Sequence, residues 1–373
     1  MKQGSLIYLL LAGMMMVIGS LSLSGCAFYR QFGQMPEGVY LEKIRQSPHY
    51  DGERFNNLEP TPMLSGNDGF ISALFKFVTT KNERAKPTMP IPTVKTDLKA
   101  IDIEQDTVIW LGHSSFYIQL AGKRLLIDPV LNDYASPVSF ANQAFDGTSI
   151  YTADDIPEID VLLITHDHWD HLDYDTVLAL KPKIKRVVTG LGVGSHFRYW
   201  GYSDHMIEEA DWNDTVNMTK ELSIHVLPAR HFSGRTLTRD KTLWVGFALE
   251  TPDRKLFFSG DSGYGQHFSE IGKRFGGFDF VFLDSGQYDN KWRYIHMTPE
   301  DASQAAEDLQ AKAYLPAHTG RFSIAYHSWD DPFIRAAKIS QQKSYRLITP
   351  MIGELIELGN TDHHFTYWWE AIQ

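Results

Sequence analysis

The segment THDHWDHLD at residues 165–173 constrains this chain more than any other feature. It places four metal-ligand side chains within six positions, namely His166, His168, Asp170 and His171. The apolar run at 159–164 that precedes it predicts a buried strand, so the cluster falls where a strand passes into a loop. Ligands of layered α/β folds bind at such strand ends. We therefore expect an α/β protein with a catalytic metal centre at the end of this strand.

Apolar and polar segments alternate through the rest of the chain. TVIWLG, SSFYIQLAG and KRLLIDP predict a meander of strands with a hairpin turn at Gly122 and Lys123. Further strands are expected near 161–165, 186–189, 222–227, 243–250, 255–260 and 279–283, and helices near 173–181, 192–200, 266–274 and 299–310. Asp173 and Thr298 carry helix-start signals, the second followed by Pro299. This order of elements predicts a layered α/β architecture.

Four ligands cannot complete two metal sites, because a catalytic zinc usually takes about three protein ligands and a water. Further ligands are therefore expected at other strand ends downstream. The candidates are His231 in LPARHFSGR, Asp261 in FFSGDSGY and His318 in LPAHTG, each after a short apolar strand and near glycine. Each of them taken alone also fits a structural role, as a buried histidine or a turn aspartate.

HDHWDH resembles the HxHxDH signature of the metallo-β-lactamase superfamily, and the three later candidates follow in that superfamily's order. The resemblance implies an αββα sandwich with a single catalytic domain and two Zn²⁺ ions, or other divalent metals. It assigns His166, His168 and His231 to the first metal, Asp170, His171 and His318 to the second, and Asp261 to both. The stretches WLGHSSFYIQL, LLIDPV, ITHDHWDHLDY, HFSGRTLTRDKTLW, FFSGDSGYG, EIGKRFGGFD, IHMTPEDA and AHTGRF look most like the N-acyl-phosphatidylethanolamine-hydrolysing phospholipase D group.

That resemblance implies hydrolysis of a phosphodiester by a hydroxide that bridges the two metals. Asp170 and Asp261 would orient the hydroxide. His296 matches a family position near the substrate, where it would hold the phosphate or protonate the leaving group, although it also fits a plain residue before a helix cap. His113 and Asp128 are expected either to fix the orientation of ligands or only to satisfy backbone groups.

The substrate stays open at this point. Residues 284–288, DSGQY, replace a Pro-Ile-Gly-Ala-Tyr segment that is common in the group, close to the expected substrate mouth. A lactonase or other ester hydrolase on the same metal site is an alternative, and so is a non-enzymatic lipoprotein with a structural metal. The formal charge of −11 and the lack of a basic run exclude nucleic acid as an expected partner and oppose a ribonuclease.

The first 25 residues carry one charge, Lys2, before a long apolar stretch that ends at LSGC, residues 23–26. They resemble a bacterial lipoprotein signal peptide, which implies cleavage before Cys26 and lipidation of this single cysteine; an uncleaved membrane anchor is the alternative. Either outcome places the protein outside the cytoplasm at a membrane. Ala27 favours the periplasmic side of the outer membrane, since the aspartate that often retains lipoproteins at the inner membrane is lacking there.

Three parts are therefore predicted. Residues 1–25 form the signal peptide, and 26–100 form a tether and an extended arm with a short apolar helix near 70–79. Residues 101–373 form the hydrolase domain. Its expected partners are the membrane, bound through the lipid anchor, and a phospholipid or other small-molecule substrate.

Overall fold

The computed structural model describes residues 28–63, 82–360 and 362–372. The predicted signal peptide, Cys26 and the helix expected near 70–79 lie outside these residues and stay predictions. Within the described ranges, no helix combines the length and the apolar character that crossing a bilayer requires.

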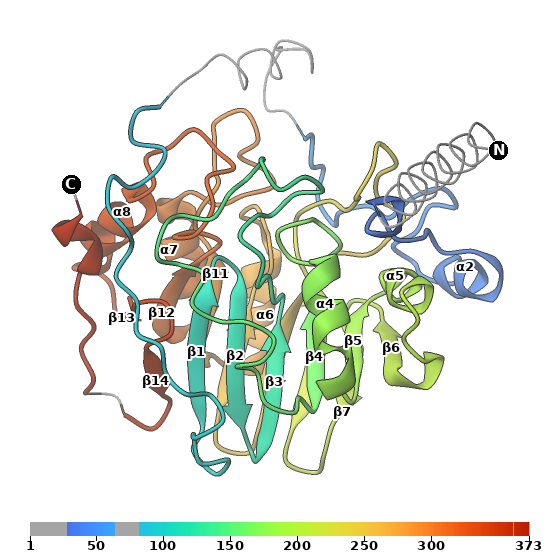
Figure 1. The fold of residues 1–373 in the computed structure, drawn as a ribbon. Helices are drawn as coiled ribbons and strands as arrows, with labels where there is room; N and C mark the ends of the chain where they lie inside the picture. The colour runs from blue at the N-terminus through green and yellow to red at the C-terminus, as the bar shows by residue number, and fades with distance from the viewer. Residues whose placement is uncertain (1–27, 64–81, 361, 373) are drawn as a thin grey trace, which may run out of the picture.

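Two seven-stranded mixed sheets make up the body of the protein (Figure 1). The first has the order β14-β1-β2-β3-β4-β5-β6, antiparallel up to β3 and parallel from there to β6. Its strands are β1 (Thr107–Gly112), β2 (Ser115–Leu120), β3 (Lys123–Ile127), β4 (Val161–Ile164), β5 (Val187–Gly190), β6 (Ile207–Ala210) and β14 (Leu355–Glu357).

The second sheet has the order β13-β12-β11-β10-β9-β8-β7. It is parallel from β13 to β10 and antiparallel from β10 to β7. Its strands are β7 (Thr215–Asn217), β8 (Ser223–Pro228), β9 (Val245–Glu250), β10 (Lys255–Phe258), β11 (Phe278–Asp284), β12 (Ala311–Ala317) and β13 (Arg346–Leu347).

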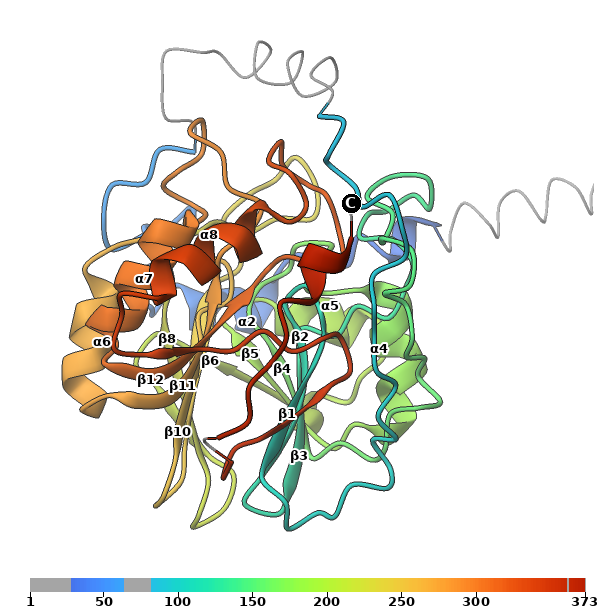
Figure 2. The ribbon, with the colours of Figure 1, turned by 90° about the vertical axis from the view of Figure 1, so that its left-hand side faces the viewer.

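Helices cover the outer face of each sheet (Figure 2). The first sheet packs against α4 (Tyr174–Leu180) and α5 (Gly194–Tyr199), and the second against α6 (His267–Phe275), α7 (Pro299–Asp308) and α8 (Asp331–Ser340). Further helical elements of the described residues are α2 (Gly38–Ile44) in the N-terminal arm and the 3-10 helices η1 (Lys181–Lys183), η2 (Asp204–Met206) and η3 (Trp368–Ala371). The layers therefore run helix, sheet, sheet, helix, which confirms the expected αββα sandwich.

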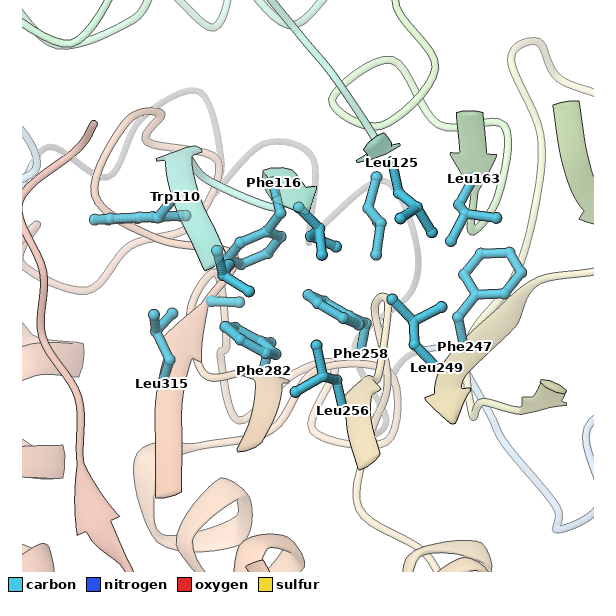
Figure 3. Close-up of a cluster of buried hydrophobic side chains, with 14 of the residues drawn as sticks. Trp110, Phe116, Leu125, Leu163, Phe247, Leu249, Leu256, Phe258, Phe282 and Leu315 are labelled. Atoms are coloured by element: carbon cyan, nitrogen blue, oxygen red, sulfur yellow. The ribbon is translucent and has the colours of Figure 1, made fainter. Parts of the chain in front are cut away.

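The main hydrophobic core lies between the two sheets (Figure 3). Strand β1 shows why: Val108 and Trp110 point into this core, whereas Ile109 and Leu111 point to the core under α4 and α5. Side chains alternate between the faces of a strand, so a strand that is apolar at every position is buried on both faces. One core shared by both sheets makes this body a single domain.

The loops that follow several strands meet at one edge of the sandwich. The HDHWDH loop follows β4, and the loops after β8, β10 and β12 carry His231, Asp261 and His318. The main chains of His113 and Thr319 form an isolated antiparallel bridge that joins the first sheet to the second at this edge. The topology thus gathers residues that are far apart in the sequence.

The predicted strands and helices are confirmed to within a few residues. Asp173 caps α4 by accepting a hydrogen bond from the Thr176 main-chain NH, and Thr298 forms a capping box with Asp301 at the start of α7. The predicted set lacks the elements α2, β6, β7, β13, α8 and β14, and it contains β12 only as the short apolar strand expected before His318.

Candidate metal centre

Three histidines and one aspartate form a first group of ligand atoms. His166 and His168 come from the loop after β4, His231 from the loop after β8, and Asp261 from the loop after β10. Their ligand atoms lie within 4.8 Å of one another. His168 Nδ1 is 2.8 Å from His166 Nε2 and 3.2 Å from His231 Nε2. These are the four residues that the resemblance assigns to the first metal.

A second group contains Asp170, His171 and His318, again with ligand atoms within 4.8 Å of one another. Asp170 Oδ2 lies 3.7 Å from His171 Nε2 and 3.9 Å from His318 Nε2. The structure adds His113 to this group, since its Nε2 is 2.9 Å from the same carboxylate oxygen. His113 is therefore in direct contact with a predicted ligand.

Asp261 lies between the two groups. Its Oδ1 is 3.0 Å from both His171 Nε2 and His318 Nδ1. Its Oδ2 is 3.7 Å from His166 Nε2 and 3.5 Å from His231 Nε2. One carboxylate oxygen faces each group, which is the geometry that a bridging ligand requires.

The electrostatics of these residues suit a divalent cation. Burial lowers the pKa values of His166, His231 and His318 well below the ordinary value, and neighbouring histidines lower them further, so the imidazoles keep free lone pairs. Burial opposes the charge of Asp261, but above all His171 lowers the pKa of this carboxyl to about 2. Neutral imidazoles and carboxylates are the protonation states in which these side chains bind metals.

The surroundings of His171 also favour a positive charge at this place. Although burial lowers it, the carboxylates of Asp261, Asp170 and Asp128 raise the pKa of His171 well above its ordinary value. His171 Nε2 and Asp261 Oδ1 are both buried and lie 3.0 Å apart, yet this contact lacks hydrogen-bond geometry, and neither atom has another hydrogen-bond partner within the described part of the chain. A cation at this place would satisfy both atoms and replace the proton.

Asp128 contacts His171 from the side opposite the cluster. Its Oδ2 lies 2.7 Å from His171 Nδ1, and its Oδ1 accepts a hydrogen bond of 2.8 Å from the Thr165 main chain. The side chain is fully buried. A carboxylate that binds the Nδ1 proton of a histidine leaves Nε2 free and fixes the ring plane, which is the contact that orients a metal ligand.

His296 lies beside the ligand groups in the loop before α7. Its ring is stacked on that of His318 with centroids 5.0 Å apart. Its Nδ1 is 2.8 Å from Oδ2 of Asp284, a buried residue at the end of β11. Although burial lowers it, the Asp284 carboxylate raises the pKa of His296 above its ordinary value. This pair holds a proton next to the cluster.

A cavity of about 260 Å³ opens above the ligand groups. Five ligand-type side chains form part of its floor: His168, Asp170, Asp261, His296 and His318. The other lining residues are mostly apolar: Met63, Phe232, Gln287, Trp292, Ile295 and Ile324. Met63, Phe232 and Ile295 also line an adjoining cavity of about 700 Å³, whose other wall is residues 54–62 of the N-terminal arm. The centre therefore faces two adjoining spaces: a small cavity whose walls suit an apolar part of a substrate, and a larger one that can hold a second, bulkier part.

The sequence pointed to most of these residues, but not to all of them. Asp284 carries the same signal as the other candidates, a carboxylate at the end of an apolar strand. From the sequence it was nevertheless named only within residues 284–288, the segment that differs from the phospholipase D group. Thr165 donates to Asp128, and Asn57 from the arm binds the main chain of His231. Neither Thr165 nor Asn57 has a spacing signal that could have identified it.

Comparisons with known proteins agree with this geometry. The family model described as "Beta-lactamase superfamily domain" matches residues 123–319. An uncharacterized protein of Mycobacterium tuberculosis is 34% identical over 317 residues, which cover 84% of this chain and 85% of that protein. The N-acyl-phosphatidylethanolamine-hydrolyzing phospholipase D 1 of Caenorhabditis elegans is 28% identical over 302 residues, 74% of this chain and 83% of that protein.

A solved structure has the same fold. It is a metallo hydrolase from the archaeon Ignicoccus hospitalis, with a TM-score of 0.54 and 19% identity, and the match covers 68% of this chain and 97% of that one. With its buried histidine and aspartate clusters at one edge of an αββα sandwich, this chain belongs to the beta-lactamase superfamily of metal-dependent hydrolases.

Proposed function

We propose that this hydrolase is a dinuclear zinc phosphodiesterase of the phospholipase D type, which acts on N-acyl-phosphatidylethanolamine-like lipids at a membrane. The observation that carries the proposal is the pair of ligand groups that share Asp261 beneath a cavity with apolar walls. The similarity to the phospholipase of Caenorhabditis elegans, along three quarters of the chain, supports this substrate class.

The charge of the cavity supports an anionic substrate only if cations are bound. The described residues that line it include no lysine and no arginine, whereas Asp170 and Asp261 contribute carboxylates. When bound, divalent cations supply Lewis-acid chemistry: they neutralise charge on phosphoryl oxygens and make water acidic enough to react near neutral pH. Metal binding and phosphate binding are therefore linked in this cavity.

The chain's own residues have separate roles in this proposal. Asp261 and Asp170 accept hydrogen bonds and so orient the attacking water. Asp284 accepts the Nδ1 proton of His296 and raises the pKa of this histidine, so the imidazolium form also carries a proton on Nε2, which it donates to the leaving-group oxygen. Phe232, Ile295 and Trp292 exclude water from the side of the substrate that they contact.

The proposed location is the periplasmic face of a bacterial outer membrane, with a lipid anchor on Cys26. Its support is the sequence alone: one charge, a long apolar stretch, and a single cysteine after LSG. A lipid anchor would keep the enzyme near phospholipid substrates.

The test is a substrate screen on purified, zinc-loaded protein with metal analysis of the same sample. We expect two equivalents of metal and release of N-acylethanolamine from N-acyl-phosphatidylethanolamine in mixed micelles. Turnover of lactones without turnover of any phosphodiester would replace the proposal with a lactonase on the same centre. If the zinc-loaded protein cleaves none of the phospholipids in the screen, the proposed substrate class is refuted. Labelling with radioactive palmitate in cells, with Cys26→Ser as the control, tests the anchor.

A further inference from the structure

Asn57, a side chain of the N-terminal arm, binds a residue of the metal centre directly. Its Oδ1 accepts a hydrogen bond of 3.0 Å from the His231 main-chain NH, and its Nδ2 donates one of 2.7 Å to the His231 carbonyl oxygen. The two residues are 174 positions apart in the sequence. A side chain of the arm thus pairs with both main-chain groups of a predicted metal ligand.

Trp244 fixes the orientation of the Asn57 carboxamide. The indole NH is a donor only, and it lies 3.0 Å from Asn57 Oδ1. The atom that faces the indole is therefore the oxygen, and the other must be the NH₂ group that faces the His231 carbonyl. All three hydrogen bonds have a defined direction, so the carboxamide cannot turn over without losing them.

No strand or helix supplies these hydrogen bonds to His231. Strand β8 ends at Pro228 and β9 begins at Val245, so His231 lies in an irregular loop. Its side chain is nevertheless held in one direction: Nδ1 donates to the Ile295 carbonyl oxygen at 2.9 Å, and Nε2 faces the first ligand group. Asn57 therefore supplies the main-chain hydrogen bonds of His231 that a neighbouring strand or helical turn supplies in regular structure.

The arm itself is fixed on both sides of Asn57. Phe55 is buried, and its NH donates to the Asp240 carbonyl oxygen at 2.8 Å. The guanidinium of Arg230 donates to the Pro60 carbonyl oxygen at 2.7 Å and to Thr61 Oγ1 at 2.9 Å. Because both flanks are tied to the domain, Asn57 can transmit a fixed position to His231.

We infer that Asn57 is a positioning residue of the metal centre: by clamping the main chain of His231 it sets where Nε2 points, and the N-terminal arm is thereby part of the site. This inference rests on the proposed role of His231 as a ligand. Partners that orient metal ligands typically contribute about 10- to 100-fold to metal affinity. We expect a loss of this size when the clamp is removed.

The experiment measures zinc affinity of the full chain by competition with a chromophoric chelator, together with the melting temperature of the metal-free protein. Asn57→Ala should weaken one of the two metal equivalents by about 10- to 100-fold. Asn57→Asp keeps the acceptor for His231 NH and Trp244 but loses the donor to the His231 carbonyl, so it should weaken the same equivalent. The matched control is Asn56→Ala, an exposed neighbour that binds Asp51 and Arg54 and should leave the affinity unchanged.

Three results would overturn the inference. One is that Asn57→Ala binds both equivalents as tightly as the wild type. Another is that Asn57→Ala and Asn57→Asp lower only the melting temperature of the metal-free protein, which would make Asn57 purely structural. A wild-type chain that binds no divalent cation refutes both this inference and the proposed function. A wild-type chain that binds zinc but cleaves no phospholipid refutes the proposed function alone, since the affinity comparison does not use turnover.

Discussion

Replacement of Asp284 by asparagine tests whether His296 is the proton donor. The change removes the charge that faces His296 Nδ1 at 2.8 Å but keeps a similar side chain in a fully buried position. General acid catalysis contributes about 10²- to 10⁴-fold to a rate. At about 1.36 kcal/mol for each factor of ten, the variant is expected to lose about 2.7 to 5.4 kcal/mol of transition-state stabilisation.

The assay compares two substrates that differ in the need for a proton. The leaving group of a phospholipid diester is an alkoxide, which requires protonation. The leaving group of bis(p-nitrophenyl) phosphate is an aryl oxide, which is stable without it. We expect Asp284→Asn to lower kcat on the lipid by the full amount and on the aryl ester by less than about tenfold. Because the Asp284 carboxylate raises the pKa of His296, its loss should also move the alkaline limb of the kcat profile to lower pH.

Equal losses on both substrates, with unchanged metal content, would refute the proton-donor role. The matched control is Glu250→Gln, which alters another histidine–carboxylate pair: His225 Nε2 on β8 lies 2.9 Å from Glu250 Oε2 on β9, and neither residue belongs to the ligand groups. This control should leave kcat on both substrates unchanged.

Three further predictions concern the metals and acid stability. Asp261→Asn removes the charge that both ligand groups share, so metal analysis should find neither equivalent tightly bound while circular dichroism shows a retained fold; two retained equivalents would contradict the bridging role. Asp128→Asn should weaken metal binding at His171 by about 10- to 100-fold, or about 1.4 to 2.7 kcal/mol, in the chelator competition, and an unchanged affinity would exclude an orienting role. Burial, aided by Arg230, lowers the pKa of His267 to about 3. Between this pKa and the ordinary value of 6.5, His267 is protonated in the unfolded chain but neutral in the folded chain. The contribution of His267 to the free energy of unfolding should therefore be fully present above pH 6.5 and fall by up to about 1.4 kcal/mol per pH unit below it. In urea unfolding, His267→Gln should make the free energy of unfolding less dependent on pH in this range. The same pH dependence in both proteins would contradict the assignment.

Much of the architecture could be predicted because its strands are buried on both faces. Runs such as VLLI in β4 and TVIWLG in β1 have an apolar residue at nearly every position, which is typical of the inner strands of a layered fold. The elements that were missed lie mostly at the edges. Strand β6 reads IEEA and β7 has three residues, so neither has the apolar pattern that marks an inner strand.

The clustered side chains that can bind metals were predictable for a different reason. Metal coordination restricts residue types and their spacing, so HDHWDH and the later His231, Asp261 and His318 remain visible as a pattern in the sequence. Residues that act on the ligands are not restricted in this way. Many side chains can accept or donate a single hydrogen bond, and Asp284 and Asn57 are recognisable only from what lies next to them.

The sequence by itself determined a layered α/β architecture and seven of the side chains that can bind metals, because burial and coordination each leave a periodic or spaced signature along the chain; the αββα sandwich was implied by the family resemblance. Only the tertiary structure decided how these side chains meet. It places Asp261 between the two groups, sets His296 against Asp284, and brings Asn57 of the arm to His231. These contacts join segments that are far apart in the sequence, and their geometry depends on how the two sheets and the arm pack, which no local pattern records.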